Sequence, residues 1–212
     1  MPEFRTEPLI VPVVSGLLPI GERDRRVALT SFSSEDGKVQ VPMRDVTCYE
    51  CGKESQVPAA ALSANCIHCH THLNMADVEI RPGSRKLTVR TLGNVRVPAA
   101  TVLSNLSIVC QNMEVNGRVS GSFRCTGTLD FNTSVCVEGS ISAGKLVVDR
   151  SAEVELAVGA AAESVEVYGS LKGRVQCKGV MHIYRGGSFE GICKAADVVV
   201  EPGGRYEDHS RF

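Results

Sequence analysis

The feature that most constrains this fold is a repeat of 17 or 18 residues that fills the second half of the chain. Apolar residues recur at one position of the repeat, in steps of 17, 18, 17, 17, 18 and 17, at Val102, Val119, Val137, Val154, Leu171, Phe189 and Tyr206. Helix-pair repeats need more than about 30 residues per unit, so this period is too short for them. It fits one coil of a parallel β-helix, in which three short strands are joined by tight corners.

Other positions of the repeat support this interpretation. Polar and apolar residues alternate within each copy, which is typical of strands with one face turned inward. Glycine recurs at Gly121, Gly139, Gly173 and Gly191, with Leu156 as the exception. Two more columns are predicted to point inward: Leu106, Phe123, Ile141, Val158, Val175 and Cys193, and then Ile108, Cys125, Ala143, Ala160, Cys177 and Ala195. We interpret Cys125 and Cys177 as small buried hydrophobic side chains.

A separate short apolar strand lies between these columns in every copy. Its seven occurrences are Val95–Val97, Met113–Val115, Leu129–Phe131, Leu146–Val148, Val165–Val167, His182–Tyr184 and Val198–Val200. Coils of a parallel β-helix stack about 4.8 Å apart. We therefore predict an all-β chain whose residues 85–206 form a parallel solenoid of about seven coils.

Two close pairs of cysteines precede the repeats. Cys48 and Cys51, followed by Cys66 and Cys69, give the pattern C-x2-C-x14-C-x2-C, and Gly52 follows the first pair. A two-residue gap lets one tight turn aim two thiolates at one ion, and 14 residues suffice for a hairpin that brings the pairs together. Four sulfur ligands at about 2.3 Å form a closed structural zinc site. We predict one structural zinc ion in residues 46–80, with iron or unligated cysteines as the alternatives.

The same site leaves little room for catalysis. Four thiolates close the metal shell, so no position remains for a catalytic water. His68, His70 and His72 alternate around Cys69, and we interpret them as surface residues, with a second metal ligand as the alternative. A module of about 35 residues has too small an apolar core to fold alone, so its folding should depend on the metal.

The N-terminal region shows little periodicity, and we predict a flexible arm and linker over residues 1–45. Leu9–Ile20 is apolar but short, and Pro12 and Pro19 interrupt it. It is interpreted as a free arm or edge strand, or as a contact with a membrane, a filament or another protein. The nine cysteines are an odd number and no secretory signal is evident, which favours the reducing cytoplasm.

G-x-x-x-G phrases also occur in the repeats, at Gly117–Gly121 and Gly169–Gly173, and Phe189-Glu190-Gly191 is similar. With the coil register, these phrases make the C-terminal 130 or so residues resemble a bactofilin domain. The resemblance implies a bacterial cytoskeletal protein with a right-handed parallel β-helix, which polymerises end to end without nucleotide. Many such proteins carry a short membrane-targeting tail. The cysteine module resembles a zinc ribbon and lies outside the usual bactofilin pattern.

Physical reasoning also predicts self-assembly. The end coils of a solenoid have unpaired strand edges, which must be capped or must pair with another chain. A tail of residues 207–212 follows the last coil without an amphipathic capping helix. The candidate assembly residues are Phe189, Val198, Val200 and Tyr206. No G-x-x-x-x-G-K-[ST] loop is present, so no nucleotide is expected.

Two other functions remain as alternatives. Hexapeptide-repeat acyltransferases are left-handed β-helices of 18 residues per coil, but the six-residue rhythm is irregular here, and only His182 and His209 lie in this region. A nucleic-acid-binding zinc ribbon would use the basic residues Arg81, Arg85, Lys86, Arg90 and Arg96. Against it stand the acidic residues Glu50, Glu54, Asp77 and Glu79, and a net charge of −1. We therefore expect a structural protein rather than an enzyme.

Overall fold

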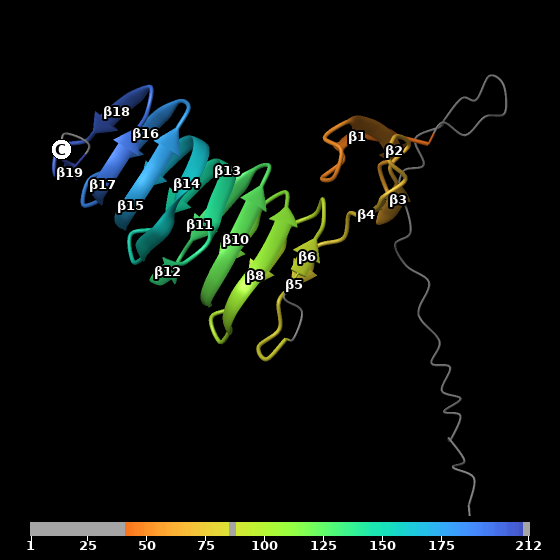
Figure 1. The fold of residues 1–212 in the computed structure, drawn as a ribbon, viewed down its shortest axis with the longest axis horizontal. Coiled ribbons are helices and arrows are strands. Elements are labelled where there is room, and N and C mark those ends of the chain that lie inside the picture. The colour runs from red at the N-terminus through yellow and green to blue at the C-terminus, as the bar shows by residue number, and fades with distance from the viewer. Residues whose placement is uncertain (1–40, 85–87, 210–212) are drawn as a thin grey trace, which may run out of the picture. The chain divides into compact units, whose positions relative to one another are not determined.

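The computed structural model describes residues 41–84 and 88–209. Residues 1–40 of the predicted arm, including Leu9–Ile20, lie outside these ranges, whereas its last residues from Met43 belong to a strand. All regular elements in the described ranges are β-strands (Figure 1), as the sequence predicts. They contain no helix of the length and apolarity needed to cross a membrane.

The cysteine module consists of two small antiparallel pairs of strands. Strand β1 (Met43–Thr47) pairs with β2 (Glu54–Pro58), and β3 (Ser63–Asn65) pairs with β4 (His72–Asn74). Each pair flanks one pair of cysteines. Only Cys48, Cys66 and Leu73 form its buried apolar cluster. A core of this size agrees with the expectation that the module needs a metal to fold.

The remaining strands form a parallel solenoid of about eight turns, one more than predicted. The added turn comes from β5 (Val78–Glu79), which pairs in parallel with β7 and so belongs to the solenoid sheet rather than to the cysteine module. The first face contains β5, β7 (Val95–Val97), β9 (Met113–Val115), β11 (Thr128–Phe131), the ends of β13 (Ser140–Val148) and β14 (Glu153–Val167), β16 (Val180–Ile183) and β18 (Asp197–Val200).

The other two faces share several long strands that turn a corner. The second face contains β6 (Thr88–Arg90), the end of β8 (Val102–Cys110), the end of β10 (Arg118–Cys125), the first part of β13, the middle of β14, and the ends of β15 (Ser170–Cys177) and β17 (Ser188–Lys194). The third face contains the first parts of β8, β10, β14, β15 and β17, with β12 (Val135–Val137) and β19 (Arg205–Asp208).

The later coils follow the predicted register. Val154, Leu171, Phe189 and Tyr206 lie on one another in consecutive coils. The short strand of the first face is also in register at six of its seven predicted places. The seventh, His182–Tyr184, was predicted one residue too late: Met181 and Ile183 are the buried residues, and His182 lies between them on the outer face.

Two inserted stretches make other column assignments wrong. Val102 is 74% exposed, because Leu103 rather than Val102 pairs with Val119. The two strands then shift in register before Leu106 and Gly121, and Asn105 takes a left-handed φ of 58° in the extra residues. Extra residues of this kind are β-bulges, and a residue with φ > 0 is common in them.

The second insertion lies in β14. Val158 is 56% exposed, and Ala160 pairs with Val175 at the position that was predicted for Val158. The observed columns of the second face are therefore Ile108, Phe123, Ile141, Ala160, Val175 and Cys193, and beside them Cys110, Cys125, Ala143, Ala162 and Cys177. Val137 is buried as predicted, but it pairs with Leu156 and not with Val154.

Candidate functional site

Each pair of cysteines lies in a tight turn, and the two turns have the same backbone hydrogen bonds. In the first turn, the N–H of Gly52 donates to the carbonyl of Cys48 at 2.9 Å, and the N–H of Cys48 donates to Lys53 at 3.0 Å. In the second, the N–H of His70 donates to Cys66, and that of Cys66 donates to Thr71, both at 2.9 Å. The repeated geometry aims both pairs of sulfurs at the space between the turns.

The residue after each second cysteine has a left-handed backbone. Gly52 has φ 68° and His70 has φ 58°. Glycine adopts this conformation at no steric cost, which explains Gly52 as the sequence suggested. The equivalent role of His70 was missed, because histidine gives only a weak signal for φ > 0.

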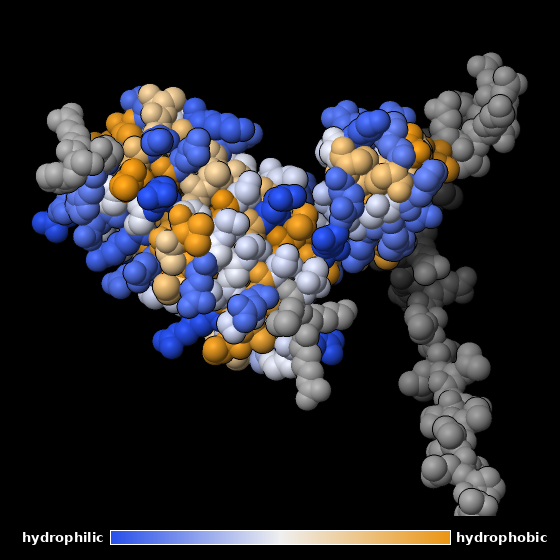
Figure 2. Space-filling view, in the orientation of Figure 1, coloured by the Kyte–Doolittle hydropathy of each residue, from blue (hydrophilic) through white to orange (hydrophobic). Residues whose placement is uncertain are grey.

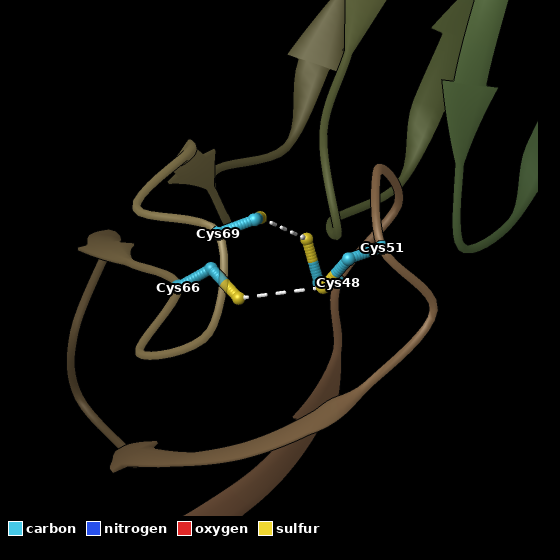
Figure 3. A group of neighbouring side chains, drawn as sticks. All are labelled: Cys48, Cys51, Cys66 and Cys69. Atoms are coloured by element: carbon cyan, nitrogen blue, oxygen red, sulfur yellow. Dashed lines mark hydrogen bonds between the residues drawn. The ribbon is translucent and has the colours of Figure 1, made fainter.

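The four sulfurs gather within 4.8 Å of one another (Figure 3), and among the described residues this group could hold a metal ion. The Sγ of Cys48 is 3.6 Å from that of Cys69, and the Sγ of Cys51 is 3.7 Å from that of Cys66. A tetrahedron with metal–sulfur bonds of about 2.3 Å has edges of about 3.8 Å. The sulfur–sulfur distances of the cluster therefore match those of a four-thiolate metal site.

Backbone N–H groups favour the ionised form of part of this cluster. The N–H groups of Cys69 and His68 lower the pKa of Cys66 to about 6. The hydroxyl and N–H of Thr71 lower the pKa of Cys69. Burial instead raises the pKa of Cys48. Metal ligands must be thiolates, and the local hydrogen bonds favour that form at Cys66 and Cys69, whereas the pKa of Cys51 is raised to about 11.

Two of the three histidines make contacts away from the sulfur cluster. His68 Nε2 lies 3.1 Å from the carbonyl oxygen of Glu54, and His72 Nδ1 lies 3.3 Å from the Oδ1 of Asn65. Both side chains are exposed, and no histidine joins the four-cysteine group. The geometry fits the interpretation of these residues as surface histidines.

A second candidate region is the C-terminal end of the solenoid. In the described part of the chain, β18 pairs only with β16, and β19 pairs only with β17. No further strand of the described residues pairs with the outer edge of either one. Val199 and Val200 are 39% and 41% exposed, and Figure 2 shows apolar surface over this end.

The candidate assembly residues occupy different depths at this end. Val200 is exposed, while Val198 and Tyr206 are half-buried against the core. Phe189 lies fully buried one coil below, and its ring stacks on Tyr206 at 5.6 Å between centroids. Phe189 therefore supports the terminal coil rather than forming its outer surface. Val199 was not predicted as an assembly residue, because the alternation places it on the outer face.

Comparison with known families agrees with this architecture. Residues 136–210 match the model of the bactofilin family, which is described as polymer-forming and cytoskeletal. The chain carries a bactofilin domain. No curated protein and no solved structure matches it. The bactofilin match includes Gly169–Gly173 and Phe189–Gly191 but not Gly117–Gly121 or the cysteine module. It thus covers the regular C-terminal coils and excludes the coil with the bulge at Asn105.

Proposed function

We propose that this chain is a structural, filament-forming scaffold, because residues 136–210 match the polymer-forming bactofilin family and the fold is a solenoid. We propose that it assembles end to end through its terminal coils without nucleotide and without catalysis. The observation that carries this proposal is the C-terminal coil, in which two four-residue strands have an unpaired edge beside exposed valines. Such an edge is a template for pairing with another chain. A second solenoid stacked there would satisfy backbone groups and bury apolar side chains together.

Tyr206 provides the test of this contact. It lies on the last strand, where its hydroxyl donates to the carboxylate of Asp208 at 3.2 Å. In the Tyr206→Glu variant, a carboxylate would approach Asp208 and a second chain's edge, so we expect no filaments by electron microscopy and a monomer or dimer by sedimentation. Circular dichroism should still report the β-fold, because only the terminal coil changes.

Tyr206→Phe is the matched control. It keeps the ring that stacks on Phe189 and removes only the hydroxyl, so filaments should persist. Long filaments from Tyr206→Glu would show that the polymer contact lies elsewhere. A wild-type protein that stayed monomeric at high concentration would contradict the assembly proposal itself.

We also propose that Cys48, Cys51, Cys66 and Cys69 bind one structural zinc ion. The support is the size of the sulfur cluster and the matched turns, which suit a closed four-thiolate site. Elemental analysis of protein purified without chelator should find about one zinc per chain. Cys136→Ser, which removes an exposed cysteine of β12, should keep that content. A zinc-free wild type, or iron in its place, would contradict the assignment.

The alternatives have less support from the described residues. An acyltransferase would need a reactive histidine, whereas His182 stacks on Tyr184 at 4.1 Å and faces Glu201. A nucleic-acid interface would need free cations, whereas Arg90 pairs with Glu50 and Arg96 with Glu114. We therefore infer that other copies of this chain are its main partner. A membrane or protein contact would involve the arm outside the described residues or the ribbon, and a cytoplasmic location remains our proposal.

A further inference from the structure

The cysteine module, here called the ribbon (Met43–Asn74), is joined to the first coil of the solenoid by several contacts. The N–H of Leu92 donates to the carbonyl of Asn74 at 2.7 Å, and the buried hydroxyl of Thr91 donates to the same carbonyl at 3.3 Å. The side chain of Leu92 packs against the cluster of Cys48, Cys66 and Leu73. The solenoid therefore contributes an apolar residue to the small core that surrounds the sulfurs.

Strand β4 has the sequence position at which an additional coil would have a strand of the second face, but it pairs within the ribbon instead. In later coils, the residues just before the corner that leads to the first face form a strand of the second face. Examples are Ile108–Cys110 and Phe123–Cys125. The corresponding residues before Asn74 belong to β4, which pairs antiparallel with β3. Strand β6 consequently pairs only with β8 among the described residues, and Arg90 at its end forms an ion pair with Glu50 of the ribbon.

The two ends of the solenoid thus differ. At the first end, β5 has only two residues and is followed closely by Pro82, which has no N–H to donate. Short edge strands and prolines are the usual protection against edge pairing. At the last end, β18 and β19 have four residues each and carry exposed valines. In the part of the chain that the structure describes, a second module lies beside the edge of the first end and not of the last.

We propose that the metal-loaded ribbon is an end cap, which hinders a second copy of this chain from stacking on β6 and so limits filament length. This regulation rests on the proposed end-to-end assembly. Loss of the metal unfolds the ribbon, since its own core is only three residues, and frees the first coil for contact. Leu92 is the main anchor, because the exposed Arg90–Glu50 pair contributes little on its own.

The test compares filament lengths of the full chain by electron microscopy, with zinc bound and after chelation. Chelation should lengthen filaments about threefold, because losing the opposing contacts of about one buried leucine raises the association constant about tenfold, and the mean length of a linear polymer grows as the square root of that constant. The double variant Leu92→Ser/Glu50→Gln keeps all four cysteines and should give the same increase in the presence of zinc. If the double variant also loses its zinc, the ribbon has unfolded and no longer contacts the first coil. The same increase in filament length is then expected.

Two controls separate the possible results. Chelated Tyr206→Glu should form no filaments, and amorphous material from it would show that chelation causes nonspecific aggregation, which overturns the proposal. Equal filament lengths for zinc-bound wild type, chelated wild type and the double variant would also overturn the end cap, while leaving end-to-end assembly intact. Absence of filaments in every sample would instead contradict the assembly on which the end cap depends.

Discussion

Replacing Val137 by aspartate should lower the free energy of unfolding of the solenoid by about 3–5 kcal/mol, because an unpaired charge would be buried among apolar side chains. Val137 has no exposed surface and pairs with Leu156 in the next coil. It lies in the middle of the stack, where neighbouring coils prevent the carboxylate from reaching water. Urea unfolding followed by circular dichroism should show a large shift in midpoint.

The adjacent residue gives a matched control. Glu138 is exposed, so Glu138→Lys should change stability by no more than about 0.5 kcal/mol. Its weak contact with the hydroxyl of Ser120, at 3.5 Å, does not alter that expectation. Equal losses from the two substitutions would mean that the alternation of inward and outward positions was misassigned.

The solenoid could be predicted because each coil must satisfy the same geometric condition. A side chain that points inward lies on its equivalent in the next coil, so a period survives in the sequence wherever coils are of equal length. Leu171, Phe189 and Tyr206 illustrate this in the last coils. The first coil was missed because β5 contributes only Val78 and Glu79, which are too few for a visible alternation.

The register of the early coils could not be derived in the same way. An inserted residue changes the facing of every residue until a second irregularity restores it, and counting alone cannot locate it. Val102 was assigned inward for this reason, although it is the most exposed of the large apolar side chains in the described residues. Asn105 and Gly159, both with φ > 0, mark the two insertions. Asparagine and glycine at irregular positions of the repeat were the available signals.

The sulfur cluster was predictable from spacing, since two C-x2-C pairs leave few arrangements that satisfy four thiolates. The connection between the ribbon and the solenoid was not. It depends on Leu92, an apolar residue between Thr91 and Gly93, which has no partner visible in the sequence. Contacts between modules do not repeat along the sequence, so they can be identified only from the structure.

Cys66→Ser should abolish zinc binding and unfold the ribbon while the solenoid remains folded. Cys66 is fully buried, and its Sγ is one of the four sulfurs that face the metal position. The same residue is one of the three in the ribbon's apolar cluster. Structural zinc contributes about 10–16 kcal/mol of apparent binding free energy in small zinc modules, far more than so few buried residues supply. The solenoid has its own continuous core from Ile80 to Cys193 and does not depend on the ion.

Hydrogen exchange measured by mass spectrometry distinguishes the two parts. In Cys66→Ser, peptides from residues 43–74 should exchange at the rate of an unfolded chain, and peptides from β9 to β17 should stay protected. Cys136→Ser is the matched substitution outside the cluster and should leave both patterns as in the wild type. The coil that contains Thr91 and Leu92 should show intermediate protection, because it loses its bonds to Asn74 but keeps the bond from the Thr91 N–H to Val109. Loss of protection throughout the solenoid would show that ribbon and solenoid fold as one cooperative unit, which would contradict their division into two modules.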